Sequence, residues 1–195
     1  MKMNKAGFTL VELLAAMVIL AILMGVAIPN VVGVINRQKN NAYVEDAKRF
    51  VARARTTFAA DVQINKTNNT CMTLEYLDNG DFDAPPNGGV YLRHVSYVRW
   101  GKDESNNYHY YVYLVECVSC DETQWNLTGN SLNGMDLRGI QGATYDDLKK
   151  VDNPNDVVIK NSKNDDALNK TAPTKDTTGC DGGVYYDNSK PHETR

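Results

Sequence analysis

A chain of 195 residues, 42% of them hydrophobic and 9% aromatic, can bury one modest core but hardly two. Its net charge of -3 at pH 7 gives no basic footprint for duplex phosphates, so direct nucleic-acid binding is not expected. The long aliphatic residues are concentrated near the N-terminus, and the remainder is polar and rich in Asn, Asp, Thr and Gly. The composition therefore predicts one globular domain preceded by an apolar segment.

The apolar segment follows a short stretch, residues 1–7, that carries two lysines and no acidic residue. Phe8–Val32 contains a single charge, and as a helix rising about 1.5 Å per residue it is long enough for a hydrocarbon core of roughly 30 Å. The lysines should keep the N-terminus cytoplasmic, which places the chain after about Ile35 on the other side of the membrane. The sequence thus predicts a membrane-spanning helix and an extracytoplasmic domain.

Glu12 is the one charge within this apolar segment. A carboxylate in a membrane helix costs roughly 2.5–3.5 kcal/mol on insertion scales, so its presence indicates a function and a partner. No cation lies within the next helical turn, but cleavage after Gly7 would create an α-amino group on Phe8 at the same depth. That amine can pair with Glu12 of its own chain or of a staggered copy. We interpret Glu12 as the charge that sets the register of packed identical helices.

A family resemblance is carried by one string of residues: Lys5-Ala6-Gly7-Phe8-Thr9-Leu10-Val11-Glu12-Leu13-Leu14. The string resembles the class III signal of type IV prepilins and pseudopilins, which a prepilin peptidase cleaves after the glycine. The resemblance implies that Gly7 ends the leader, that Phe8 becomes the N-methylated first residue, and that Glu12 is the acidic fifth residue of the mature chain. Gly25 and Pro29 lie where that family's helix carries helix-weakening residues. Beyond about residue 60 the resemblance is limited to general architecture.

Two other interpretations of the N-terminus stay open. An ordinary secretory signal also combines lysines with an apolar run. Gly25-Val26-Ala27 is a small-x-small triplet of the kind that a signal peptidase cleaves, which would make Ile28 the new N-terminus. That alternative leaves Glu12 without an explanation. A plain single-pass membrane helix that does not polymerise is the second alternative, in which Pro29 is a tolerated kink.

Helical periodicity continues beyond the apolar segment. Apolar residues recur there in steps of three and four, while charged residues occupy the opposite face. The positions that predict the buried stripe are Tyr43, Ala47, Phe50, Val51, Ala54, Phe58 and Val62. A single helix from Phe8 to about Asn65 would be roughly 85 Å long, which suits a structural spine better than an enzyme core.

The remaining chain predicts an antiparallel sheet beside that helix. Leu74, Leu77 and Phe82 suggest a short helix or turn. Residues 90–100 and 108–118 are rich in Val, Tyr and Leu and are joined by a polar segment, which is typical of a hairpin. Thr144–Asp147 has the spacing of a reciprocal helix cap, and short strands are expected at 157–159 and 184–186. The polar segment 161–179 is expected to be an exposed loop.

Four cysteines remain, at positions 71, 117, 120 and 180. In an extracytoplasmic domain an even number favours disulfides, and four cysteines permit three pairings. The alternative is a structural zinc site, because Cys117 and Cys120 also have zinc-ligand spacing and Cys71 and Cys180 would complete a tetrahedron. We predict disulfides, with no metal and no other cofactor.

Enzyme chemistry is not predicted. His94, His109 and His192 stand apart in the sequence, and no nucleophile motif, phosphate-binding loop or paired-histidine metal motif is present. The oxygen-rich residues between Asp78 and Asp83 lack the spacing of a helix-loop-helix calcium site and predict a turn. The chain is expected to be a structural protein.

Together these observations predict an α+β, type IV pilin-like fold. We divide the chain into a leader at 1–7, an apolar membrane and assembly helix at 8–35, its amphipathic continuation at 36–65, and a globular extracytoplasmic domain at 66–195. The resemblance implies a pilus subunit that supports adhesion, motility or DNA uptake. It also implies as partners other pilins, a prepilin peptidase, a membrane platform and an assembly ATPase. The precursor is expected in the cytoplasmic or inner membrane and the assembled form at the cell surface. A pseudopilin of a secretion or competence system is the nearest alternative, and a membrane-tethered ligand- or metal-binding domain is the alternative of another class.

Overall fold

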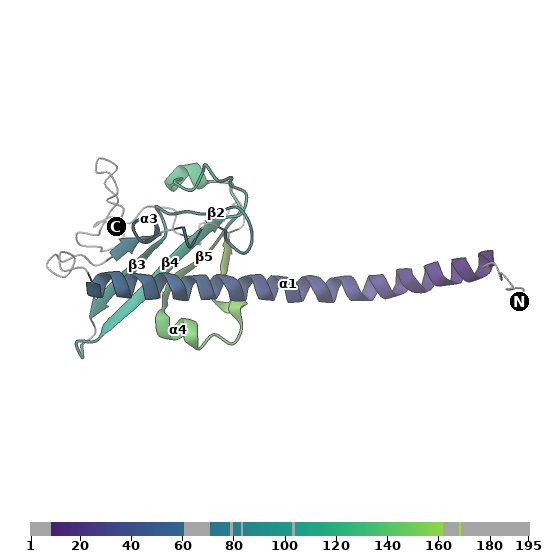
Figure 1. The fold of residues 1–195 in the computed structure, drawn as a ribbon, viewed down its shortest axis with the longest axis horizontal. Coiled ribbons are helices and arrows are strands. Elements are labelled where there is room, and N and C mark those ends of the chain that lie inside the picture. The colour runs from purple at the N-terminus through teal and green to yellow at the C-terminus, as the bar shows by residue number, and fades with distance from the viewer. Residues whose placement is uncertain are drawn as a thin grey trace, which may run out of the picture. The chain divides into compact units, whose positions relative to one another are not determined.

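A computed structural model describes residues 9–60, 71–78, 80–82, 84–102, 104–161 and 168. The chain divides into two compact units, residues 1–38 and residues 39–195, and each is considered by itself. The long helix α1 (Leu10–Ala60) begins in the first unit and ends in the second (Figure 1). All the other described elements belong to the second unit.

The second unit is built on an antiparallel sheet whose strands differ in length. In chain order these are β1 (Cys71–Thr73), β2 (Val90–Tyr91), β3 (Tyr97–Lys102), β4 (Tyr108–Cys117), β5 (Leu137–Thr144) and β6 (Ile159–Asn161). The spatial order is β1-β3-β4-β5-β6, and every pairing is antiparallel. β2 pairs with the end of β4, where Val90 lies opposite Cys117, beyond the part of β4 that pairs with β3. The α+β fold class with a long N-terminal helix packed on an antiparallel sheet is thereby confirmed.

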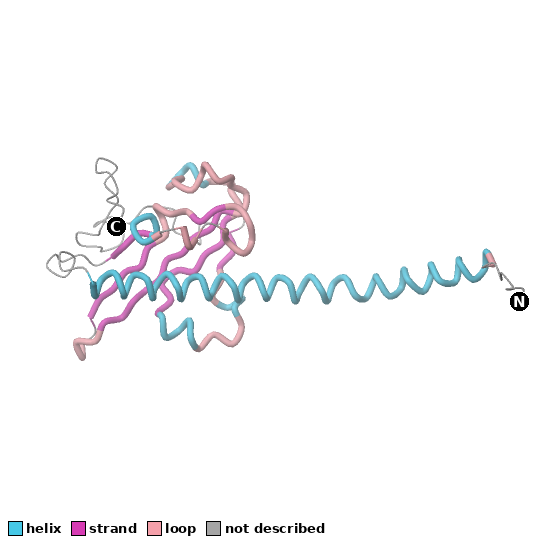
Figure 2. Tube along the Cα trace, in the orientation of Figure 1, coloured by secondary structure: helices cyan, strands magenta, loops and turns pink. Residues whose placement is uncertain are grey.

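The core of this unit lies between the sheet and the part of α1 that follows Lys39 (Figure 2). The predicted apolar stripe is confirmed, because Tyr43, Ala47, Phe50, Val51 and Ala54 are fully buried. Phe58 is only partly buried, and Val62 lies outside the described residues, as does the predicted end of the helix near Asn65. The sheet contributes a matching face to the same core: Val98, Trp100, Val112, Leu114 and Ile140.

Short helices complete the unit. α3 (Leu74–Leu77) follows β1 directly, with the Thr73 hydroxyl accepting from the Tyr76 amide, so the predicted short helix is confirmed. α4 (Tyr145–Lys149) begins with the predicted reciprocal cap, in which Thr144 and Asp147 each accept from the other's backbone amide. Two 3₁₀ turns, η1 (Gly129–Leu132) and η2 (Pro154–Asp156), lie in the connections around β5.

The hairpin prediction needs one correction. β4 and the polar connection after β3 are as expected, but residues 90–100 do not form one strand. The chain turns between β2 and β3, where the Ser96 amide donates to the Leu92 carbonyl at 3.0 Å, and Leu92 and Val95 are buried inside the turn. Strand β6 begins at Ile159 instead of 157, and the strand predicted at 184–186 lies outside the described residues, as does nearly all of the predicted loop at 161–179.

A glycine is required where β2 approaches β4. Gly89 has a φ of +74°, a conformation that residues with a Cβ adopt only under strain. A Cβ at this position would also overlap the carbonyl oxygen of Cys117 on β4. The close contact between the two backbones therefore depends on the missing side chain.

Candidate assembly and processing segment

The N-terminus of α1 carries a reciprocal cap between Thr9 and Glu12. The Glu12 carboxylate accepts from the Thr9 amide and from the Thr9 hydroxyl, both at 2.9 Å, while the Glu12 amide donates to the Thr9 hydroxyl at 3.3 Å. This is a capping box, in which the cap residue and the third helical residue satisfy each other's otherwise unpaired groups. The carboxylate of Glu12 is therefore held at the helix N-terminus, against the amide and the hydroxyl of Thr9.

Sequence reasoning did not assign a role to Thr9. The signal was present, because Thr-x-x-Glu at the start of an apolar helix is the capping-box spacing, and the same pattern was recognised at Thr144–Asp147. Thr9 had been considered only as part of the cleavage string. The structure makes it the residue that orients Glu12.

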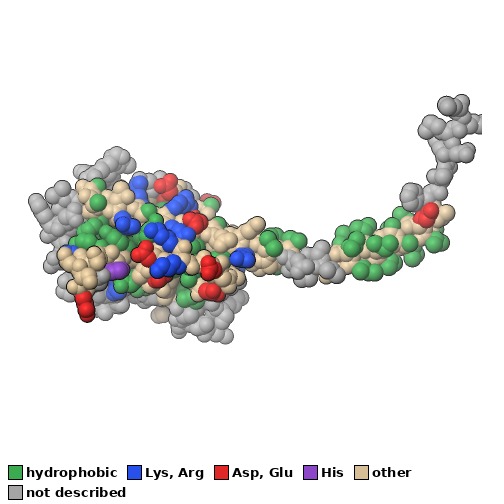
Figure 3. Space-filling view, turned by 90° about the horizontal axis from the view of Figure 1, so that it is seen from below, with side chains coloured by type: hydrophobic (Ala, Val, Ile, Leu, Met, Phe, Trp, Pro, Cys, Tyr) green, Lys and Arg blue, Asp and Glu red, His purple; other side chains and the backbone are tan. Residues whose placement is uncertain are grey.

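The first part of α1 exposes the apolar side chains that the structure describes, and Figure 3 shows one face of this apolar surface. Leu10 is 79% exposed and Ile22 is 64% exposed, and the large hydrophobic residues from Leu10 to Ile35 whose side chains are described are all exposed. An apolar surface of this extent marks a site of interaction in a protein. Among the described residues, no helix combines the length and the apolar character needed to cross a membrane. The membrane span predicted at 8–35 stays a prediction.

Of the residues predicted to act in processing and assembly, some lie outside the described residues and others lie within α1. Gly7 and Phe8 lie outside the described residues. Gly25 and Pro29 lie within α1, whose backbone is helical from Leu10 to Ala60 without a break at either position. The pairing of Glu12 with a neighbouring amine is therefore still a prediction, for which the structure supplies the placement of one partner.

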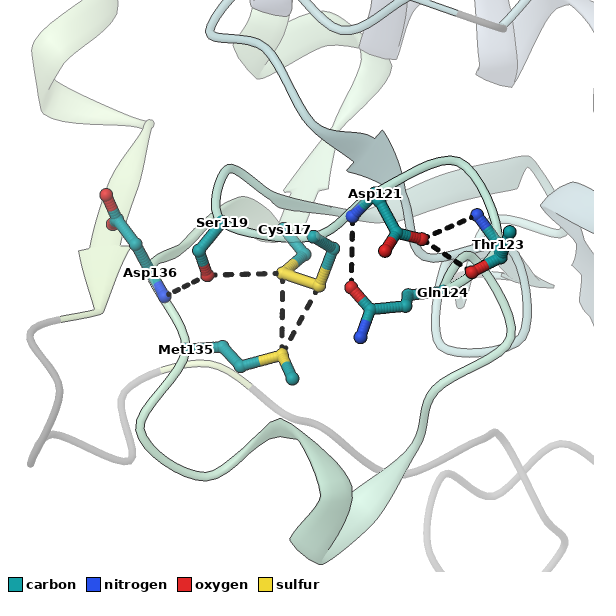
Figure 4. The surroundings of a disulfide bond; sticks show 8 residues. Cys117, Ser119, Asp121, Thr123, Gln124, Met135 and Asp136 are labelled. Atoms are coloured by element: carbon teal, nitrogen blue, oxygen red, sulfur yellow. Dashed lines mark hydrogen bonds between the residues drawn. A yellow bond between two sulfur atoms is a disulfide. The ribbon is translucent and has the colours of Figure 1, made fainter.

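The cysteines are disulfide-bonded in the described part of the chain. Cys117 and Cys120 form a bond within one turn after β4, and the sulfur of Met135 lies 3.6 Å and 3.3 Å from their sulfurs (Figure 4). Cys71 is also disulfide-bonded. Cys180 lies outside the described residues. Sulfurs joined in a disulfide are not thiolates and do not serve as zinc ligands in that state.

Comparison with protein families decides the nature of the N-terminus. Residues 2–28 match the family model of the prokaryotic N-terminal methylation motif. The chain carries a prepilin-like methylation motif. No curated protein and no solved structure matches the chain significantly.

The methylation motif covers most of the predicted leader, the predicted cleavage position after Gly7, and Glu12, and it ends one residue before Pro29. The resemblance to type IV prepilins is thereby confirmed. The motif supports a type IV pilin-like or pseudopilin-like protein, a class of structural and typically non-enzymatic proteins that are processed by a prepilin peptidase and assemble with other pilins. The four cysteines and the globular unit lie outside the motif.

A second feature that sequence reasoning missed is the buried carboxyl of Glu116, which is hydrogen-bonded to partly buried polar side chains. Glu116 on β4 is fully buried and accepts from the Asn87 amide nitrogen at 2.6 Å, while Arg138 on β5 donates to the Asn87 oxygen at 2.7 Å. Burial raises the pKa of the Glu116 carboxyl to about 7, against the opposing effects of Asn87 and Arg138. Alternation along β4 was the available signal, since Val112, Leu114 and Glu116 share the core face.

Proposed function

We propose that this chain is a structural subunit of a type IV pilus, inserted in the membrane as a precursor and assembled at the cell surface through its N-terminal helix. The methylation motif carries the proposal, because its match at residues 2–28 includes the start of a helix whose described apolar side chains are exposed. Packing of identical helices would bury that surface, and apolar area removed from water contributes about 25 cal/mol per Å². Neither membrane insertion nor assembly requires catalysis by this chain.

In this proposal the Thr9–Glu12 cap prepares the chain for assembly. Cleavage after Gly7 by a prepilin peptidase exposes the Phe8 amine, which N-methylation leaves cationic. The amine pairs with Glu12 of an adjacent subunit, and Pro29 provides a position at which the helix can adjust. Other pilins, a membrane platform and an assembly ATPase are the implied partners. Adhesion, motility or DNA uptake are the surface functions that such a filament supports.

The deciding experiment is the replacement of Glu12. Glu12→Ala should leave cleavage and membrane insertion intact, because neither step needs the carboxylate, while filaments are lost. Removing one member of a buried ion pair costs about 3–5 kcal/mol, and this cost recurs at each subunit. Glu12→Gln keeps the size and a hydrogen-bond acceptor and should also assemble poorly, since the anion is gone.

The readout is the yield of sheared filaments together with the mass of the membrane-bound subunit. Mature protein should begin at Phe8 and carry one added methyl group, and a bulky residue in place of Gly7 should leave the precursor uncut. Glu45→Ala is the matched control, because Glu45 is an exposed acid on the same helix whose ion pair, with Lys48 at 2.7 Å, is local to one helical turn. Wild-type filament numbers from Glu12→Ala cells would contradict the proposal, as would an N-terminus at Ile28.

A pseudopilin of a secretion or competence system has the same processing and the same helix packing. The two functions differ in the polymer, since a pilus subunit forms long surface filaments at normal expression and a pseudopilin does not. A membrane-tethered binding domain would be cleaved or retained without forming stoichiometric polymers. Electron microscopy of the sheared fraction distinguishes the three.

A further inference from the structure

A cavity of about 400 Å³ lies in the second unit, far along the chain from the methylation motif. Its size falls within the range of about 300–1,000 Å³ that small-molecule sites occupy. The residues that line it are Phe82, Val90, Tyr91, Arg93, Glu122 and Trp125. None of them belongs to the segment that the proposed assembly uses.

One part of the cavity is apolar and rigid. Phe82, Val90 and Tyr91 are each at least 94% buried, and the rings of Phe82 and Tyr91 meet edge to face with their centroids 6.3 Å apart. The Tyr91 hydroxyl donates to the Asp46 carboxylate at 2.6 Å, so the hydrogen-bonding group of this tyrosine is already satisfied. Little of their own surface is exposed, so the carbon surface open to a ligand is that of the partly buried Trp125, and these three residues support the cavity from behind.

The polar groups of the cavity are of opposite kinds. The Arg93 guanidinium is held 2.9 Å from the Asp78 carboxylate and 5.6 Å from the centre of the Trp125 ring, and the Arg93 amide donates to the Trp125 carbonyl. A guanidinium only donates hydrogen bonds, whereas the carboxylate of the exposed Glu122 only accepts them. The cavity thus presents a fixed donor and an acceptor around an aromatic surface.

The loop that carries Glu122 and Trp125 is held by its own contacts (Figure 4). It leaves β4 through the Cys117–Cys120 disulfide, and Asp121 then accepts from the amide and the hydroxyl of Thr123. The Asp121 amide donates to the Gln124 side chain at 3.0 Å. The side of the cavity that this loop forms is therefore ordered before a ligand binds, which reduces the entropic cost of binding.

From this arrangement we propose that the cavity binds a neutral, polyhydroxylated ligand with an apolar face, namely a hexopyranose. A simple anion would be attracted by Arg93 but repelled by Glu122, and a simple cation would be attracted by Glu122 but repelled by Arg93. A hydroxyl group can donate to Glu122 and accept from Arg93 without either repulsion. The C–H face of a pyranose ring matches the aromatic surface of Trp125.

The test is a titration of the full-length chain, solubilised in a polyoxyethylene detergent because alkyl glycosides would compete for the site. The probes are D-glucose, D-galactose, D-mannose and N-acetyl-D-glucosamine, with choline and inorganic phosphate as the cationic and anionic alternatives. Tryptophan fluorescence reports binding, because Trp125 lines the cavity whereas Trp100 is 4% exposed in the core. A ligand of about twelve non-hydrogen atoms at ordinary ligand efficiency should bind with a Kd on the order of 1 mM.

Two variants sharpen the result. Glu122→Ala removes the exposed acceptor and should weaken sugar binding about tenfold, the effect of one hydrogen bond to a charged group. Trp125→Phe keeps an aromatic surface and should retain sugar binding, whereas Trp125→Ala should abolish it. Because both variants lose the fluorescent reporter, their binding is measured by ligand-observed NMR. Glu104→Ala is the control, since Glu104 is an exposed acid in the connection between β3 and β4 and does not line the cavity. The proposal is overturned if none of the four sugars gives a saturable change, if Glu122→Ala binds as tightly as the wild type, or if choline or phosphate saturates the site instead.

Discussion

The two ends of α1 differ in where their apolar side chains find partners. From Tyr43 to Ala54 the apolar stripe is fully buried within the chain's own globular unit, with charged residues on the other side of the helix. From Leu10 to Ile35 the large apolar side chains that the structure describes are exposed. One helix therefore combines an amphipathic segment, which packs within the globular unit, with an apolar segment that the described residues leave uncovered.

The largest expected effect tests this contrast directly. Phe50→Ala should lower the free energy of unfolding of the globular unit by about 3–5 kcal/mol, because it removes a fully buried ring from the core. Leu20→Ala, at a position 53% exposed, should change it by less than about 0.5 kcal/mol. Chemical denaturation followed by the fluorescence of Trp100 measures both. Equal effects of the two substitutions would show that the apolar segment already contributes to the folded subunit.

A second prediction concerns the acid beneath the buried segment. The unfolded chain loses the Glu116 proton near pH 4.5, whereas the folded chain keeps it until about pH 7. The free energy of unfolding should therefore fall by about 3 kcal/mol at most as the pH rises from 4.5 to 7. Above pH 7 this contribution should no longer change. The groups that act on this titration are Tyr43 on α1, Arg138 on β5, Asn87 and Asp136.

Glu116→Gln should remove that part of the pH dependence, because the amide keeps an oxygen for the Asn87 contact but does not titrate. The measurement is the difference between wild type and variant in denaturation midpoint at pH 5 and at pH 8, which cancels the contribution of the other carboxylates. An unchanged difference between the two pH values would mean that Glu116 is ionised throughout. The apolar segment cannot contribute a similar pH dependence, because from Leu13 to Ile35 it contains no ionisable side chain.

The disulfide that the structure describes in full closes a turn at the end of β4. Breaking the Cys117–Cys120 bond should cost about 2 kcal/mol, because the loop that it closes is very short. Cys180 is the remaining cysteine of the sequence, so we predict that it is the partner of Cys71. Peptide mapping without reductant should recover a linked pair that contains both residues, and the intact mass should be about four hydrogens below that of the reduced chain. Four free thiols with one bound zinc would contradict the disulfides and restore the metal alternative.

The smallest expected effect belongs to the start of the apolar segment. Thr9→Ala should weaken the helix N-terminus by about 1 kcal/mol, as loss of a cap does, while Thr9→Ser keeps the hydroxyl and serves as the control. Filament yield should fall less than in Glu12→Ala, because the carboxylate is still present but is no longer oriented. Equal loss in the two variants would mean that the orientation of Glu12 matters as much as its charge.

Much of the fold was predictable because periodicity reports burial. Steps of three and four from Tyr43 to Ala54 identified the buried face of α1, and the spacing of Thr144 and Asp147 identified a helix cap. The break between β2 and β3 was not predictable in this way. Leu92 and Val95 are buried in a turn, where an apolar residue gives the same signal as it does in a strand.

In the candidate site, too, some residues were predictable from the sequence and others were not. Glu12 stood out because an isolated charge in an apolar run is costly, and the methylation motif confirms the signal in which it lies. The contact from Thr9 and the cavity around Trp125 depend on which side chains meet in space. Residues 82, 93 and 125 are separated in the sequence and share no spacing that would have indicated a common cavity.

The glycine at the junction of β2 and β4 has a consequence for the variation that this protein can accept. Because the Gly89 backbone has a positive φ and touches the carbonyl of Cys117, neither a small nor a flexible side chain can be accommodated by local adjustment. In a saturation mutagenesis library selected for folded protein, position 89 should be depleted of every substitution, alanine included. Gly88, which also has a positive φ but has open space around its Cβ position, should accept asparagine. Two adjacent glycines would then differ completely in their mutational tolerance.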